Sequence, residues 1–138
     1  MSQENAELMR AWFECWNATG NPDLSALDPG LIYHPRADEP DPSPHVGRDA
    51  YEQLLRGFIE SFAEIKFDVL KVREAGDYVV ASTVLRCRVR DSGISVNEAY
   101  VFVIRVRDGL VVEGWEYRTM EEALEAVGLS EQDAHADS

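Results

Sequence analysis

The sequence predicts a single α+β domain in which helices pack on a mainly antiparallel sheet. In the first half of the chain, apolar residues recur at helical spacing between Asn5 and Ala18 and again between Arg48 and Ala63. From Ile65 onward the apolar period changes to two, in four segments separated by Gly76-Asp77, Ser92-Gly93 and Asp108-Gly109. The chain has 138 residues, the usual length of one domain, and we assign residues 1–129 to it.

The helices are predicted from apolar faces and from the residues that end them. Met9, Trp12, Phe13 and Trp16 form one aromatic face of the first helix, and Gly20 stops the pattern. A second, very short helix is expected after Asn21-Pro22, a helix-start signature. The helix from Arg48 to Ala63 carries a broad apolar stripe, as a helix that faces a core requires. Near the end of the chain, Thr119 and Glu122 form a capping box and Gly128 ends a short helix.

The strands are predicted from alternation and turn residues. Asp28-Pro29-Gly30 should turn the chain before a short strand from Leu31 to His34, and the Pro-rich stretch from Pro35 to Pro44 reads as a surface loop. Asp108-Gly109 is typical of a two-residue hairpin, because that turn needs a positive φ at both positions. Along the strand from Tyr78 to Arg90, alternation places Val79, Ala81, Thr83, Leu85, Cys87 and Val89 on one face and three arginines on the other. We expect residues 130–138 to form a flexible acidic tail.

Composition excludes several classes of partner. The chain has 26 acidic and 13 basic residues, a formal net charge of -13, which is the wrong sign for a phosphate backbone or an anionic membrane surface. No apolar run approaches the roughly 20 residues that span a bilayer, and Met1 to Glu7 lacks the pattern of a signal peptide. The sequence therefore predicts a cytoplasmic protein without nucleic-acid or membrane partners.

The order of elements resembles the SnoaL-like branch of the nuclear-transport-factor-2-like superfamily. The phrases that carry the resemblance cover most of the chain: Trp16-Asn17, Ile32-Tyr33-His34-Pro35, Gly47-Arg48-Asp49-Ala50, Gly76-Asp77-Tyr78-Val79, and Arg107-Asp108-Gly109-Leu110 leading to Trp115. The resemblance implies a cone-shaped α+β barrel, with three N-terminal helices packed on a strongly curved, mixed but mainly antiparallel sheet and a short C-terminal helix. It also implies a pocket between helices and sheet and a homodimer formed through the outer sheet face.

The resemblance does not imply one reaction. Similar proteins include polyketide cyclases, ketosteroid isomerases, epoxide hydrolases, dehydratases and binding domains without catalysis, so the function must be argued from the site. The first helix carries Trp and Phe where the steroid isomerases use an oxyanion-binding Tyr, and no Asp, Arg, Asp set of the epoxide hydrolase kind is evident. No cofactor is implied, and no Cys or His cluster has the spacing of a metal site.

Three residues are candidates for acid or base catalysis. His34 precedes Pro35 where related isomerases carry a general-base aspartate, and its unperturbed pKa of about 6.5 suits proton transfer, although a strand-end histidine is often a hydrogen-bonded wall residue. Glu98 shares a strand face with apolar residues, but it could equally reach solvent or pair with Arg88. Glu116 follows Trp115 where SnoaL-like cyclases carry a catalytic aspartate, and alternation groups it with Val112 and Gly114 without settling which face is inward.

Aromatic side chains supply candidate ligand contacts. The candidates for a pocket that binds a flat, apolar molecule are Trp12, Trp16, Tyr33, Phe58, Tyr100, Phe102, Trp115 and Tyr117. Tyr33, Tyr100 and Tyr117 are the best hydrogen-bond donors for a substrate oxygen, while core packing is the alternative use of the whole set. The sequence favours a pocket protein for a small apolar or aromatic carbonyl compound, acting as a cofactor-free isomerase, cyclase or dehydratase. The alternative is a non-catalytic ligand-binding or dimerisation domain.

Overall fold

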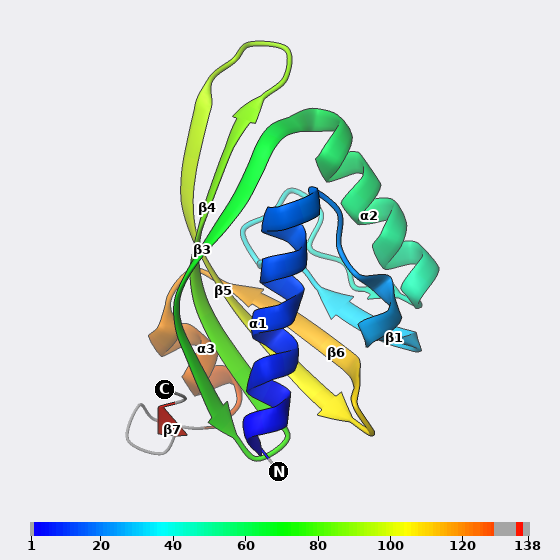
Figure 1. Ribbon diagram of the computed structural model, residues 1–138, viewed down its shortest axis with the longest axis vertical. Helices are drawn as coiled ribbons and strands as arrows, with labels where there is room; N and C mark the ends of the chain where they lie inside the picture. The colour runs from blue at the N-terminus through cyan, green and yellow to red at the C-terminus, as the bar shows by residue number, and fades with distance from the viewer. Residues whose placement is uncertain (1, 129–134, 137–138) are drawn as a thin grey trace.

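The computed structural model describes residues 2–128 and 135–136. These residues form one curved sheet with helices on both of its faces (Figure 1). In chain order, the elements are α1 (Ser2–Thr19), a 3-10 turn η1 (Leu24–Ala26), β1 (Leu27–His34), β2 (His45–Val46), α2 (Arg48–Ser61), β3 (Phe62–Ala75), β4 (Tyr78–Val89), β5 (Ser95–Arg107), β6 (Leu110–Tyr117), α3 (Met120–Ala126) and β7 (His135–Ala136). The predicted α+β class and the four-strand meander are confirmed.

The sheet is mixed and open. Its strands follow the order β2-β1-β6-β5-β4-β3-β7, and every neighbouring pair is antiparallel except β1 and β6, which are parallel. In that parallel pair Tyr33 lies beside Gly114 and His34 beside Trp115. The first strand of the chain is therefore joined to the last long one, which brings two distant parts of the sequence to the same place.

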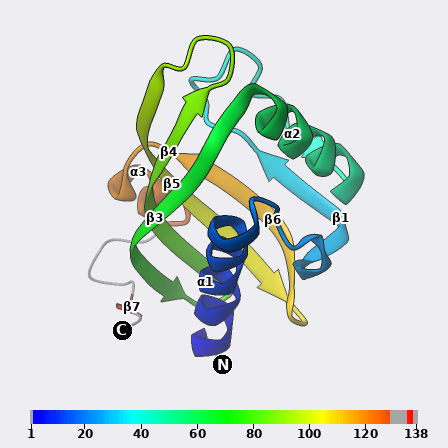
Figure 2. The same cartoon turned by 45° about the horizontal axis from the view of Figure 1, so that its top comes forward.

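The two faces of the sheet are covered by different helices. Figures 1 and 2 show α1 and α2 on one face, which we name the inner face, and α3 on the opposite, outer face. The inner core is the larger and includes residues of α1 such as Met9, Phe13 and Trp16. The outer core is small: Ala123 and Leu124 of α3 pack on Val80, Val101 and Val103. A strand such as β4 thus buries apolar residues on both sides.

Several local predictions are confirmed. Asp108 and Gly109 have φ angles of 53° and 77°, the positive values that the two-residue hairpin between β5 and β6 needs. The Thr119 hydroxyl accepts a hydrogen bond from the Glu122 N–H at 3.1 Å, which caps α3. Along β4, the predicted inward side chains from Val79 to Cys87 are mostly buried, while Arg86 and Arg88 are exposed.

The segment before His34 differs from its prediction. The short second helix is a single 3-10 turn, capped by the Asp23 side chain. The expected turn at residues 28–30 is instead an irregularity inside β1, between Leu27 and Ile32. The Asp28 carboxylate accepts a hydrogen bond from the Gly30 N–H at 2.8 Å, so the side chain satisfies backbone that the strand leaves unpaired.

The end of the chain is described only in part. His135–Ala136 form a short antiparallel pair with Arg73 and Glu74 of β3. The rest of the tail that we predicted over residues 130–138 lies outside the described residues. Among the helices that the structure does describe, none combines the length and the apolar character that crossing a membrane requires.

Candidate functional site

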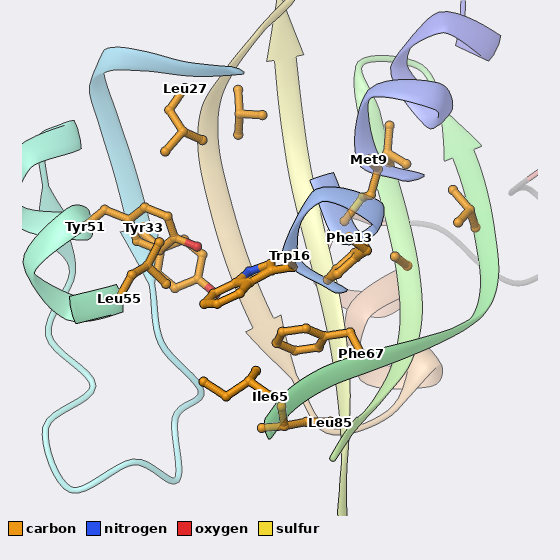
Figure 3. Packing of buried hydrophobic residues seen from close by; sticks show 14 of the residues in the cluster. Met9, Phe13, Trp16, Leu27, Tyr33, Tyr51, Leu55, Ile65, Phe67 and Leu85 are labelled. Atoms are coloured by element: carbon orange, nitrogen blue, oxygen red, sulfur yellow. The ribbon is translucent and has the colours of Figure 1, made fainter. Parts of the chain in front are cut away.

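A cavity of about 810 Å³ lies between α1, α2 and the inner face of the sheet. Its wall is mainly apolar and aromatic, with side chains from both helices facing those of the strands, as Figure 3 shows for Trp16, Tyr33 and Phe67. A volume of this size fits a drug-sized organic molecule. Six predicted ligand contacts are among the lining residues: Trp12, Trp16, Tyr33, Phe58, Tyr100 and Phe102.

A carboxyl group and two tyrosines form the polar cluster of this cavity. The Tyr33 hydroxyl donates a hydrogen bond to Glu116 Oε2, across the parallel pair of β1 and β6. The Tyr51 hydroxyl is hydrogen-bonded to that of Tyr33, and the two ring centroids are 4.4 Å apart. The backbone N–H of Arg36 also donates to the Glu116 carboxyl. Glu116 is therefore fixed in position by two donors.

The surroundings shift the protonation of this cluster. Burial raises the pKa of Glu116 above its ordinary value, and the hydrogen bonds from Tyr33 and from the Arg36 backbone oppose that rise. Burial, followed by the nearby Glu116 charge, raises the pKa of Tyr33 well above its usual range, and burial does the same for Tyr51. The tyrosines thus remain neutral donors, while the carboxyl group can exchange a proton closer to neutral pH.

Arg36, which no sequence pattern marks, organises the mouth of the cavity. Its guanidinium lies 4.4 Å from the ring centroid of Tyr100 and donates to the Ala99 carbonyl and the Asp38 carboxylate. Nη2 is 3.5 Å from an oxygen of Glu98. These contacts fasten the start of the Pro-rich loop to β5, so that the loop forms one wall of the cavity.

Glu98 faces the cavity side of β5, as alternation predicts, together with Val96, Tyr100, Phe102 and Ile104. Its side chain is nearly half exposed, at 48%, and its ionic partner is Arg36. Arg88, the partner considered from sequence, pairs instead with Glu64. Glu98 is therefore a charged group at the mouth, apart from the buried Glu116.

Three predicted site residues lie outside the cavity. His34, Trp115 and Tyr117 are on the outer face, because alternation along β1 and β6 turns them away from Tyr33 and Glu116. The His34 ring stacks on Trp115 at 5.3 Å, and its Nε2 is 2.8 Å from Glu113 Oε2. Trp115 and Tyr117 pack in the outer core beside α3. The expectation that these three residues line the cavity is thus corrected.

A bulge and a glycine determine which residues of β6 line the cavity and how Tyr33 passes over this strand. Glu116 and Gly114 share one side as predicted, and the structure makes it the inner side. Val111 rather than Val112 lines the cavity, because the register shifts between β5 and β6 at this point. A Cβ atom at Gly114 would lie 2.9 Å from Cδ1 of Tyr33. Only a residue without a side chain lets the Tyr33 ring cross β6 to reach Glu116.

The polar contacts of Tyr51 and Arg36 were not predicted from the sequence. Tyr51 belongs to the apolar stripe of α2, and its hydroxyl is distinguishable from core packing only once the partner strand is known. Arg36 follows Pro35 in a loop, where sequence period carries no information. Within residues 2–128 and 135–136, no group of three His, Cys, Asp or Glu side chains is arranged to hold a metal ion.

Comparisons with known proteins agree with this architecture. The family model of the SnoaL-like domain matches residues 9–114. No curated protein matches the chain. Among solved structures, a proposed SnoaL-like polyketide cyclase from Jannaschia sp. CCS1 has a TM-score of 0.73 at 19% identity, with 94% of each chain covered. IdmH, a proposed polyketide cyclase from Streptomyces antibioticus, has a TM-score of 0.68 at 20% identity and covers 80% of this chain and 88% of its own.

A third structure is described as having a ketosteroid isomerase-like fold. This protein of Catenulispora acidiphila, solved in complex with trimethylamine, has a TM-score of 0.70 at 17% identity over 90% of this chain and 94% of its own. At such identities the likeness shows the fold, whereas the family model covers most of the chain. The chain belongs to the SnoaL-like domain family.

Proposed function

We propose that this protein binds a small apolar or aromatic carbonyl compound and catalyses a cofactor-free isomerisation, cyclisation or dehydration, with Glu116 as the general acid and base. The observation that carries the proposal is the placement of one firmly held carboxyl group, with a raised pKa, in the wall of an apolar cavity. A base in such a position is the main requirement for removing a proton next to a carbonyl.

The chemistry follows from the groups present. The ionised Glu116 takes a proton from the carbon next to the carbonyl, the electron pair moves to the carbonyl oxygen, and Glu116 then returns the proton to a different atom of the substrate. Because the carboxyl group is buried, its proton affinity is closer to that of the reacting carbon than in water. Tyr33 and the Arg36 N–H keep the carboxyl in one orientation, and Tyr51 holds Tyr33.

Non-catalytic ligand binding is the second candidate. It is favoured by the surroundings of the other acids along the cavity wall: Glu98 is paired with Arg36 at the mouth, Asp41 is exposed, and half-buried Glu39 acts on Glu116 through its charge, which raises the Glu116 pKa. His34, which could have been a second base, lies on the outer face. Among the described residues, no second carboxyl group is hydrogen-bonded to Glu116 in the way that carboxyl pairs sharing a proton are.

Enolisation of a probe ketone separates the two candidates. 2-Tetralone is incubated with the protein in D2O near pH 6, and the loss of its C1 protons is followed by proton NMR. We expect wild type to accelerate the exchange and Glu116→Gln to lose at least about 100-fold of the acceleration, while His34→Gln keeps it. Equal exchange rates with wild type and Glu116→Gln would remove Glu116 as the base and leave ligand binding as the function.

The expected homodimer through the outer sheet face is part of the same proposal. The α3 helix covers the outer face at Val80, Val101 and Val103, and the dimer surface that we propose lies over the strands β3 and β4 beyond this helix. Leu70, an exposed apolar residue, lies on β3. Close to it, Asp68 of β3 forms an ion pair with Arg86 of β4. Sedimentation velocity tests the proposal: Leu70→Arg should lower the sedimentation coefficient to that of a monomer.

A further inference from the structure

The indole N–H of Trp16 is a polar group in the inner wall that the proposed mechanism does not use. Trp16 lies on α1 with only 2% of its surface exposed, and it lines the cavity. Its ring packs against Phe58 and Phe67, with centroids 6.2 Å and 5.9 Å away. Both partners are carbon rings, so neither offers a nitrogen or oxygen acceptor to the indole N–H.

Within the described part of the chain, no acceptor is hydrogen-bonded to Trp16 Nε1. By contrast, the adjacent Asn17 uses both ends of its amide, on the N–H and the carbonyl of Phe67, each at 2.8 Å. Buried indole N–H groups usually find a partner, because an unpaired buried donor costs about 1–3 kcal/mol. Trp16 Nε1 is also not among the fully enclosed unpaired polar atoms of the described residues, so it keeps some accessible surface in a residue that lines the cavity.

The buried tyrosine donors of the cavity are already engaged, and the other nitrogen and oxygen donors of its wall are less buried than Trp16; these are Trp12, Arg36, His45, Gln53, Ser61 and Tyr100. The Tyr33 hydroxyl donates to Glu116, and the Tyr51 hydroxyl is bonded to Tyr33. Tyr100 is at the mouth, under the Arg36 guanidinium. Trp16 therefore offers a donor that is both buried and unpaired, beside the Phe67 ring in the cavity wall (Figure 3).

We propose that the indole N–H of Trp16 donates a hydrogen bond to the acceptor oxygen of the cavity's ligand, so that the cavity selects carbonyl compounds over hydrocarbons of the same shape. The inference rests on the proposed function for the class of ligand, and it adds the residue that recognises the oxygen. Without this donor, a carbonyl oxygen bound against this part of the wall would lose its hydrogen bonds to water and gain none from the protein. With the donor, the same oxygen is paired, and the negative charge that develops on it during enolisation is stabilised.

A matched pair of probes tests the proposal directly. 2-Tetralone and tetralin share one carbon skeleton and differ by the carbonyl oxygen. The chain has three tryptophans, so its indole N–H signals in a ¹H-¹⁵N spectrum are assigned by single Trp→Phe variants. We expect 2-tetralone to move the Trp16 signal downfield, because hydrogen bonding deshields the donor proton, and tetralin to move it much less. No shift with 2-tetralone up to its solubility limit, or equal shifts with both probes, would overturn the proposal.

Dissociation constants provide the second readout. We expect the dissociation constant of tetralin divided by that of 2-tetralone to be roughly tenfold larger in wild type than in Trp16→Phe. The variant cannot donate the hydrogen bond, so it leaves the oxygen of 2-tetralone unpaired. Trp12→Phe, on the same helix and also in the cavity wall, and Tyr100→Phe at the mouth are the controls and should keep the wild-type ratio. A ratio unchanged in Trp16→Phe, or lost in Tyr100→Phe instead, would contradict the assignment.

The two proposals fail separately. Glu116→Gln should keep the preference for 2-tetralone while losing enolisation, because Trp16 recognises the oxygen independently of the base. If wild type shows the preference but no enolisation, the catalytic proposal fails and the Trp16 assignment stands. If enolisation proceeds at the wild-type rate in Trp16→Phe with an unchanged probe ratio, Glu116 stands and the Trp16 assignment fails.

Discussion

Gly114→Ala tests whether the site depends on the missing side chain at this position. An added Cβ would lie 2.9 Å from Cδ1 and 3.1 Å from Cε1 of Tyr33, whereas carbon atoms in contact are ordinarily about 3.5–4.0 Å apart. The Tyr33 ring has little room to move away, because the centroid of the Tyr51 ring is 4.4 Å from its own and the Tyr33 hydroxyl is hydrogen-bonded to Glu116. The substitution must therefore displace the Tyr33 ring or move β6 away from β1.

The expected cost follows from this overlap. Forcing a methyl group into a packed interior destabilises by about 1–3 kcal/mol. For a domain between the small and large size classes, this corresponds to a fall in melting temperature of roughly 3–12 °C. The enolisation rate should fall as well, because Tyr33 no longer holds the carboxyl of Glu116 in one orientation.

Gly57→Ala is the matched control. Gly57 lies in α2, and a Cβ there would meet nothing within 4 Å. The same chemical change should stabilise the protein by up to about 1 kcal/mol through helix propensity. Urea denaturation of both variants measures the two free energies of unfolding. If Gly114→Ala unfolds at the wild-type urea concentration, or shifts in the same direction as Gly57→Ala, the packing argument is refuted.

Three further perturbations have defined outcomes. Burial raises the pKa of Glu116, so the stability that the protonated carboxyl contributes is complete below about pH 4.5 and is lost as the pH rises through the pKa of the folded state. The free energy of unfolding of Glu116→Gln, relative to wild type, should therefore increase from about pH 4.5 upward in urea denaturation. A difference that stays constant with pH would contradict this. Asn17→Ala leaves the Phe67 backbone unpaired and should cost about 1–3 kcal/mol, measured the same way; a cost below 0.5 kcal/mol would show that solvent replaces the amide. Thr119→Ala removes the cap on the Glu122 N–H and should cost about 1 kcal/mol, whereas Thr119→Ser should cost much less.

The fold could be predicted from the sequence because its signals are local. The period-two segments, the Asp108-Gly109 turn and the Thr119 cap depend on neighbouring residues, and the structure contains each of them. The face of β5 that carries Glu98 was also predictable, because apolar residues occupy one of its sides more consistently than the other.

The site was less predictable because it depends on which faces of distant strands are covered. On β6 both faces are partly apolar, since α3 covers the outer one, so the pattern could not decide between Trp115 and Glu116. Tyr33 and His34 were both considered pocket residues, although adjacent residues of a strand point to opposite sides. The bond between Tyr33 and Glu116 joins residues 83 positions apart, which no local rule connects.

The parallel pairing of β1 with β6 has a consequence for when the site can exist. Glu116 reaches Tyr33 only after the intervening helix and the three-strand meander have been brought into place, and the chain entropy lost in closing so large a loop makes such long-range pairings form slowly. A partly folded intermediate that contains α1, α2 and the hairpin of β3 and β4 would have most of the apolar residues of the cavity wall but would lack Glu116. Ligand affinity should then emerge earlier in refolding than the capacity to move a proton.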